Sequence, residues 1–168
     1  NNGTFSNTFV SIGIVGGGTT STTISNNTIG STSTANSIQF TGTGTPLTAM
    51  GLSGIFVSSG PTLSSITNNT IANLHNSYVG TSSTTALTVR GIDLAVGANT
   101  IDNNIIRNLT SASTIAGAGT TANICGIVMR STTAPSTVTN NKIYSLKLTT
   151  GNHQKIFVLS FSFKLAGN

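Results

Sequence analysis

The chain has 168 residues, of which only 5% are charged, seven Lys or Arg against two Asp, while Thr, Ser and Asn occupy 72 positions. This composition excludes coiled coils and helical bundles, which need Ala, Glu, Lys, Leu and Arg in bulk, and a hydrophobic content of 36% excludes a chain kept disordered by its charge. A single cysteine, Cys125, excludes an internal disulfide framework. The sequence contains no run of 18 apolar residues, so it predicts no membrane-spanning helix.

Two short motifs recur in turn along the chain. The first is a Gly-Ile pair followed by alternating apolar residues, at Gly13-Ile14, Gly54-Ile55, Gly91-Ile92 and Gly126-Ile127. The second is an asparagine pair, whose copies begin 42, 35 and 37 residues apart, at Asn26-Asn27, Asn68-Asn69, Asn103-Asn104 and Asn140-Asn141. Self-similarity at a nearly fixed period indicates a repeat architecture. We divide one domain, residues 1–168, into units at approximately 11–51, 52–88, 89–123 and 124–160 and a partial unit at 161–168.

Aliphatic residues flank each asparagine pair at constant positions. One lies two residues before the pair, at Ile24, Ile66, Ile101 and Val138. Another lies three residues after the first asparagine, at Ile29, Ile71, Ile106 and Ile143. A leucine follows three residues later in the last three repeats, whereas Ser31-Thr32 stand at that place in the first. Terminal repeats often deviate in this way.

These motifs predict short β-strands joined by an asparagine turn. Ile55 and Val57 alternate with period 2, as one buried face of a strand requires, and no segment shows a sustained period of 3.6. Ile66 and Ile71 are five residues apart, so a regular strand would place them on opposite faces. Both can be buried only if the chain bends at the asparagine pair, and Asn tolerates the left-handed conformation that such a bend needs.

Repeats of this length fit either propeller blades or the coils of a solenoid. A propeller blade needs antiparallel strands with hairpin turns, and hairpin dipeptides such as Asn-Gly are nearly absent. A parallel solenoid instead stacks equivalent residues at about 4.8 Å. We therefore expect an all-β chain of four to five coils of 35–42 residues, with long Ser/Thr/Gly loops. The expected core stack is Ile14, Ile55, Ile92 and Ile127 with Ile29, Ile71, Ile106 and Ile143, and all eight paired asparagines form the expected ladder.

The units Gly54-Ile55-Phe56-Val57 and Ile66-Thr67-Asn68-Asn69-Thr70-Ile71 resemble the right-handed parallel β-helix repeat of the pectate-lyase-like superfamily. The resemblance covers about residues 11–146. With their long coils and low charge, these repeats are most similar to those of large secreted bacterial surface proteins. The resemblance implies a place outside the cell or on its surface, and roles in attachment, in fibre or filament formation and in glycan contact.

Enzymes of this superfamily use several carboxylates, either as Ca²⁺ ligands or as acid and base. This chain has only Asp93 and Asp102. Asp93 lies between two apolar residues and is expected to point away from the core, and Asp102 takes an ordinary polar turn position. Glycoside hydrolysis needs two carboxylates at a defined separation, and Ca²⁺ needs 6–8 oxygen ligands. We expect no catalytic residue, no metal site and no cofactor. Cys125, His75 and His153 are interpreted as an inert thiol and two solvated side chains.

Two functions remain open at this point. We expect a non-catalytic structural or adhesive module of a secreted bacterial surface protein, fibre or filament, which associates with itself or continues the same solenoid. The alternative is a glycan-binding module, or an inert section of a carbohydrate-active enzyme, with an extracellular polysaccharide as partner. Neither nucleic-acid binding nor membrane insertion is expected, because the net charge of +5 comes from sparse cations, the first at Arg90, and not from a dense patch.

Overall fold

The computed structural model describes residues 8–15, 21–41, 50–58, 63–78, 87–95, 97–114, 122–130, 135–150 and 156–161. Sheet A contains, in spatial order, β1 (Thr8–Ile14), β5 (Met50–Val57), β9 (Leu87–Leu94), β12 (Ile124–Met129) and β15 (Ile156–Phe161). Sheet B contains β2 (Ser21–Ser25), β6 (Leu63–Thr67), β10 (Ala98–Asp102) and β13 (Thr137–Thr139). Sheet C contains β3 (Thr28–Ile29), β4 (Ile38–Phe40), β7 (Thr70–Ala72), β8 (Leu74–Asn76), β11 (Ile105–Ser111) and β14 (Lys142–Leu148).

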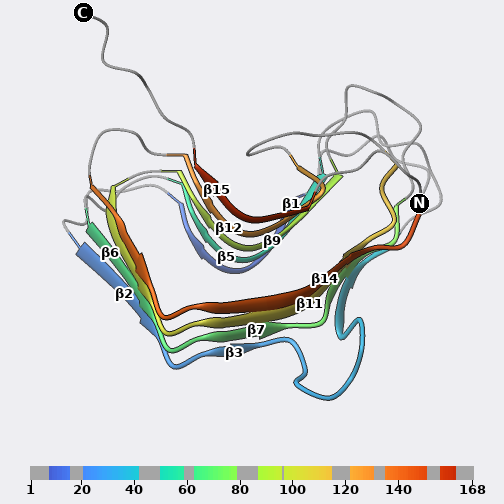
Figure 1. Ribbon diagram of the computed structural model, residues 1–168, viewed down its shortest axis with the longest axis horizontal. Coiled ribbons are helices and arrows are strands. Elements are labelled where there is room, and N and C mark those ends of the chain that lie inside the picture. The colour runs from blue at the N-terminus through green and yellow to red at the C-terminus, as the bar shows by residue number, and fades with distance from the viewer. Residues whose placement is uncertain are drawn as a thin grey trace, which may run out of the picture.

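The chain visits the three sheets in the same order in every repeat, and all the strand pairs are parallel. Figure 1 shows sheet A above, sheet B to the left and sheet C below, with strands of successive repeats side by side. The prediction of an all-β chain with parallel sheets is therefore confirmed. Two parts of the sequence prediction, His153 and nearly all of the partial unit at 161–168, lie outside the described residues.

The hydrophobic core fills the space between the sheets. Its members come from equivalent positions of successive repeats, and those of the two middle repeats are fully buried. Ile71 and Ile66 are both at 0% exposure, so the chain does bend between them as their odd spacing requires. Of the expected core stack, the structure buries Ile29, Ile55, Ile71, Ile92, Ile106 and Ile127, and packs Ile14 and Ile143 against the core as partly buried side chains.

The register of sheet A corrects the expected alignment of the first repeat. Ile12 pairs with Ile55, and Ile14 pairs with Val57, two residues further along the strand. The Gly-Ile pair of the first repeat is therefore two residues out of register with the others. Strand periodicity could not reveal this, because a shift of two residues keeps each side chain on the same face.

A second correction concerns the missing leucine of the first repeat. Ile38 pairs with Leu74, so an isoleucine on β4 takes the place that was assigned to Ser31-Thr32. Residues 30–37 form a longer connection between β3 and β4 than the single residue between β7 and β8. Because of this longer connection, the aliphatic residue comes later in the sequence of the first repeat, but it takes the same place in the sheet.

Sheet A bows toward sheet C at a column of glycines. A Cβ atom on Gly91 would lie 2.6 Å from Ile106 Cγ2 and 2.6 Å from the carbonyl oxygen of Gly126, and Gly54 and Gly126 are enclosed in the same way. Only glycine allows the strand this close approach. Figure 1 shows the result, a curved sheet A whose hollow side faces away from sheet C.

Candidate functional site

The hollow outer face of sheet A carries side chains that a regular strand would send to opposite faces. Arg90 and Asp93 are three residues apart on β9, yet both point away from the core. Val89 and Ile92, which precede each of them, are both core residues. The alternation is therefore interrupted once between them, at Gly91, where the strand bends while its register with both neighbouring strands stays one to one. The glycine that bends the sheet also brings the two charged residues onto one face.

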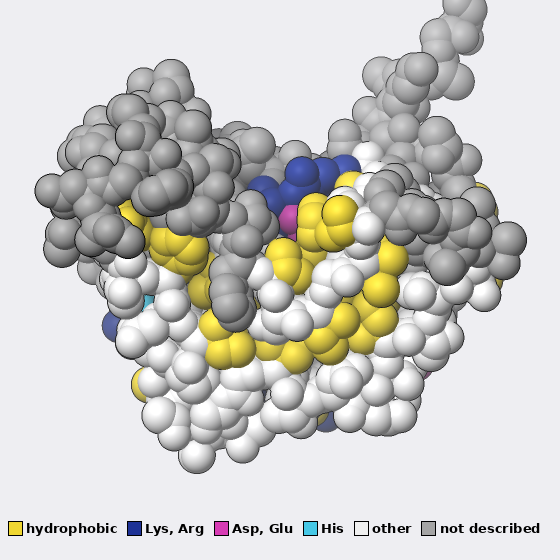
Figure 2. All heavy atoms as spheres, turned by 180° about the vertical axis from the view of Figure 1, so that it is seen from behind, with side chains coloured by type: hydrophobic (Ala, Val, Ile, Leu, Met, Phe, Trp, Pro, Cys, Tyr) yellow, Lys and Arg dark blue, Asp and Glu magenta, His cyan; other side chains and the backbone are white. Residues whose placement is uncertain are grey.

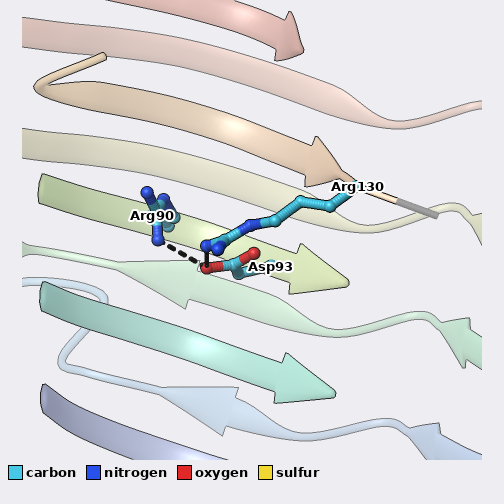
Figure 3. Close-up of polar contacts among 3 residues, drawn as sticks. All are labelled: Arg90, Asp93 and Arg130. Atoms are coloured by element: carbon cyan, nitrogen blue, oxygen red, sulfur yellow. Dashed lines mark hydrogen bonds and ion pairs between the residues drawn. The ribbon is translucent and has the colours of Figure 1, made fainter. Parts of the chain in front are cut away.

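Arg90, Asp93 and Arg130 form an ion cluster on this face (Figure 3). Asp93 Oδ2 accepts from Arg90 Nη1 at 2.7 Å and from Arg130 Nη2 at 2.5 Å. Arg130 follows the neighbouring strand β12 and reaches back to β9. The carboxylate is 1% exposed, whereas the Arg130 side chain is 37% exposed. In Figure 2 basic side chains and an acidic one gather on the hollow side of the molecule.

The cluster has one cation more than it has anions. Burial lowers the pKa of the Arg90 guanidinium, and the nearby charge of Arg130 lowers it further, while Asp93 opposes both effects. Asp93 Oδ1 is buried and makes no hydrogen bond. Removing one partner of such a buried pair costs about 3–5 kcal/mol, because it leaves an uncompensated charge. The arrangement holds the Arg130 guanidinium at the surface and leaves Asp93 Oδ1 buried beneath it.

Cys125 lies beside this cluster, in register with Arg90 on the next strand. It packs with Ala122 and Val128 in a small apolar cluster on the outer face, against which Phe157 is partly buried. Burial raises the pKa of the Cys125 thiol to about 11, because the effect of burial is larger than the lowering effect of the nearby Arg90 charge. The thiol is therefore protonated at neutral pH and is a poor nucleophile.

The two carboxylates of the chain lie on different sheets. Asp102 ends β10 in sheet B, where its Oδ1 accepts from Thr139 Oγ1 at 2.6 Å and from Asn140 Nδ2 at 2.8 Å. These hydrogen bonds lower the pKa of Asp102. On sheet C, His75 Nδ1 lies 2.7 Å from Thr110 Oγ1, and burial lowers its pKa. Within the described residues no three metal-ligating side chains come together.

The predicted asparagine pairs lie at the corner between sheets B and C, and the structure separates the two members of each pair. The first member has a positive φ, between 53° and 59°. Its backbone makes the turn, and its side chain is exposed. The second member points inward and continues the stack. The first members are Asn26, Asn68, Asn103 and Asn140, and the second members are Asn27, Asn69, Asn104 and Asn141.

Asn104 shows the full hydrogen bonding of this inner asparagine ladder. Its Nδ2 donates to Asn141 Oδ1 at 2.9 Å, to the carbonyl of Ile66 at 2.8 Å and to the carbonyl of Asp102 at 3.1 Å. Its Oδ1 accepts from the backbone N–H of Asn69 at 2.9 Å and from Asn69 Nδ2 at 3.0 Å. Each amide thus satisfies buried backbone groups of its own and neighbouring repeats.

Sheet C bends at a second turn that sequence reasoning missed. Asn73, Asn108 and Ser145 have φ values of 59°, 55° and 56°. Asn108 Nδ2 donates to Asn73 Oδ1 at 3.1 Å. The available signal is the asparagine inside Ile71-Ala72-Asn73-Leu74, which recurs as Asn108 in the next unit, whereas the prediction uses only the spacing of the aliphatic residues.

No protein-family model matches the chain, and no curated protein or solved structure matches it either. The described residues include no helix with the length and apolarity that crossing a membrane would require.

Proposed function

We propose that the chain is a section of a right-handed parallel β-helix and serves as a non-catalytic structural or adhesive module of a secreted bacterial surface protein, fibre or filament. The observation that carries this proposal is the stack itself. Parallel strands, core isoleucines and ladder asparagines recur at equivalent positions, so each repeat is supported by its neighbours. A scaffold of this kind extends by adding repeats and needs no further chemistry.

The placement of the acidic groups supports a non-catalytic role. Asp93 is held by two arginines on sheet A, and Asp102 by hydrogen bonds on sheet B. A hydrolase of this fold needs carboxylates that face one substrate. These two are the whole acidic inventory of the chain, and they face different directions.

The partner we propose is another section of the same stack, from the same chain or from a second copy. A hollow of about 240 Å³ lies beside the last described repeat, between Ile143 and Val158. Val158 is 52% exposed there. The ladder is directional, because each asparagine donates to the next one along the stack. One end of a stack therefore offers amide donors and the opposite end offers amide acceptors.

Sedimentation and negative-stain microscopy over a concentration series test this proposal. We expect concentration-dependent assemblies, and we expect Val158→Lys to abolish them because it places a charge in the apolar contact. Thr100→Lys, on the exposed outer face of sheet B, is the matched control and should assemble normally. A chain that stays monomeric at every concentration would contradict self-association.

The second candidate is a glycan-binding module or an inert section of a carbohydrate-active enzyme. The observation in its favour is the partly exposed Arg130 on the hollow face of sheet A, next to the buried carboxylate of Asp93. A sugar carboxylate or hydroxyl could pair with this guanidinium. Loss of glycan binding in an Arg130→Gln variant that circular dichroism shows to be folded would support this candidate over the first.

A further inference from the structure

The inner asparagine ladder leaves hydrogen-bonding groups unused at both of its ends. Along the ladder, each Oδ1 accepts from the backbone N–H and the Nδ2 of the asparagine one repeat earlier, as Asn104 Oδ1 does from Asn69 at 2.9 Å and 3.0 Å. Asn27 is the first member, and among the described residues its Oδ1 has no such donor. Asn141 is the last member. Its Nδ2 donates to two carbonyls, but the described part of the chain offers no further asparagine to its Nδ2 or its backbone N–H.

Backbone hydrogen bonds cross from repeat to repeat at the same corner, and they run in both directions. The N–H of the first asparagine donates to the carbonyl that precedes the pair in the next repeat, as Asn103 does to Thr139 at 3.2 Å. The residue after each pair donates back to the second asparagine of the preceding repeat, as Lys142 does to Asn104 at 2.8 Å. The same two bonds recur at each corner between described repeats.

The two ends of the stack carry the two halves of this pattern. We call the open edge of β2 and β3 the first-repeat end, and the open edge of β13 and β14 the last-repeat end. If a second copy continued the stack, Asn140 N–H would donate to its Ser25 carbonyl. The Thr28 N–H of that copy would donate to the Asn141 carbonyl. Its Asn27 Oδ1 would accept from the backbone N–H and the Nδ2 of Asn141.

The apolar side chains at the two ends match as well. Val138 and Ile143 are half-buried at the last-repeat end and border a hollow of about 240 Å³. Strand pairing places Ile24 and Ile29 at the equivalent positions of the first repeat. A second copy in register would therefore set these two isoleucines over the hollow, as the core side chains of successive repeats pack inside the stack.

We infer that the first-repeat end of a second copy docks on the last-repeat end of this chain, head to tail, and that the asparagine ladder continues across the contact. This inference rests on the proposed self-association and specifies its partner surface and polarity. Two last-repeat ends do not fit together in this way, because the donors of Asn141 would face further donors. A head-to-tail contact leaves one end of each kind open at every step, so it adds copies without closing.

Cysteine cross-linking tests the polarity and the register of this contact. Thr23 and Thr137 occupy the same column of sheet B, and both are exposed. Within one chain they are three strand spacings apart, roughly 14 Å, which is beyond the reach of a disulfide. Across the proposed contact they are neighbours at about 4.8 Å. The full chain with Thr23→Cys, Thr137→Cys and Cys125→Ala, which removes the native thiol, should therefore oxidise to a ladder of multimers on a non-reducing gel.

Matched variants control for chance collisions and for register. Thr23→Cys alone and Thr137→Cys alone should give no cross-link, and a mixture of the two proteins should give dimers only. Ser21→Cys with Thr137→Cys is the register control. Ser21 is exposed on the same face, but two residues along β2 it would lie roughly 8 Å from Thr137 of the neighbouring copy, so it should give about tenfold less product. Adding Val158→Lys to the matched pair should abolish the ladder.

The possible failures separate this inference from the proposed self-association. Assemblies that sediment normally but show no cross-link in the matched pair would overturn the head-to-tail contact alone. Dimers from Thr137→Cys by itself would do the same, because they require two last-repeat ends to meet, and so would equal cross-linking of the Ser21 control. A chain that sediments as a monomer at every concentration would overturn both. Circular dichroism verifies that each variant is folded, and the mixture of single variants reads the same contact independently of the double variant.

Discussion

The two asparagines of each turn are chemically identical but have opposite tasks. The first adopts a left-handed backbone conformation, which costs other L-residues about 1 kcal/mol or more and which Asn tolerates because its short side chain can bond locally. The second supplies donors and an acceptor to backbone groups at the corner between the sheets. Substitutions should therefore affect the two positions differently.

We predict that Asn104→Ala lowers the free energy of unfolding by about 3 kcal/mol or more. The change removes hydrogen bonds to two carbonyls and two ladder neighbours, and each buried group left unsatisfied costs about 1–3 kcal/mol. Asn103→Gly is the matched control. It retains the left-handed turn at an exposed position, so stability should change by less than about 1 kcal/mol. Urea unfolding of both variants checks the prediction, and equal losses would contradict it.

Cys125 gives a prediction about alkaline pH. Its pKa is raised to about 11 by burial, whereas an unfolded thiol titrates near 8.5. The folded state keeps a proton that the unfolded chain releases, so this contribution to stability is complete below about pH 8.5 and is lost as the pH rises toward 11.

Between pH 8 and pH 10, we expect Cys125 to account for a loss of about 2 kcal/mol in unfolding free energy. The measurement is urea unfolding at both pH values. Cys125→Ala is the control, since it removes this titration and leaves every other group in place. An identical pH dependence in the two proteins would mean that the thiol ionises as easily in the folded state as in the unfolded chain.

At the scale of one element, the glycine at the centre of a sheet A strand has two effects. It lets the strand approach an isoleucine of sheet C closely, as Gly91 approaches Ile106, and it interrupts the side-chain alternation. The first effect creates the hollow outer face, and the second turns Arg90 and Asp93 to that face together. One residue without a side chain thus determines both the shape of the candidate site and its charge.

Gly91→Ala should destabilise the fold by about 3 kcal/mol, because the added methyl would meet the backbone carbonyl of Gly126, which cannot move without displacing β12. Gly13→Ala should cost less than about 1 kcal/mol, since its nearest neighbour is the flexible Val10 side chain at 3.3 Å. Thermal unfolding of the two variants compares them directly. If Gly13→Ala proves as costly as Gly91→Ala, the register assigned to β1 is wrong.

At the scale of the whole molecule, the repeats differ in how deeply their core side chains are buried. Ile66 and Ile101 in the middle repeats are fully buried, whereas Val138 at the same position of the next repeat is only half-buried. A stack of this kind opens from its ends, because each repeat is stabilised only by its neighbours.

We predict that the backbone amides of β6 and β10 exchange with solvent about tenfold more slowly than those of β13. Each of the two inner strands pairs on both sides within sheet B, and β13 pairs on one side. Hydrogen exchange measured by mass spectrometry resolves these segments. Equal protection throughout would indicate a single cooperative unit, or an assembly in which a second copy covers β13. Repeating the measurement with Val158→Lys distinguishes these two cases.

The sequence alone determined the elements that depend on local pattern. Period-2 apolar residues predicted strands, the odd step from Ile66 to Ile71 predicted a bend, and Asn68 was available to make it. Fixed repeat spacing then predicted parallel stacking. These properties follow from the geometry of neighbouring residues, so a reader of the sequence can obtain them without knowing the fold.

Only the tertiary structure decided the features that depend on contacts between repeats. The register of Ile12 and the place of Ile38 were hidden, because a shift of two residues or an inserted loop leaves the apolar pattern intact. The ion cluster was hidden as well, since Arg90 and Asp93 share a face only through the bend at Gly91, and Arg130 follows another strand. Side chains on neighbouring repeats are brought together by strand pairing, which the linear order of the residues does not contain.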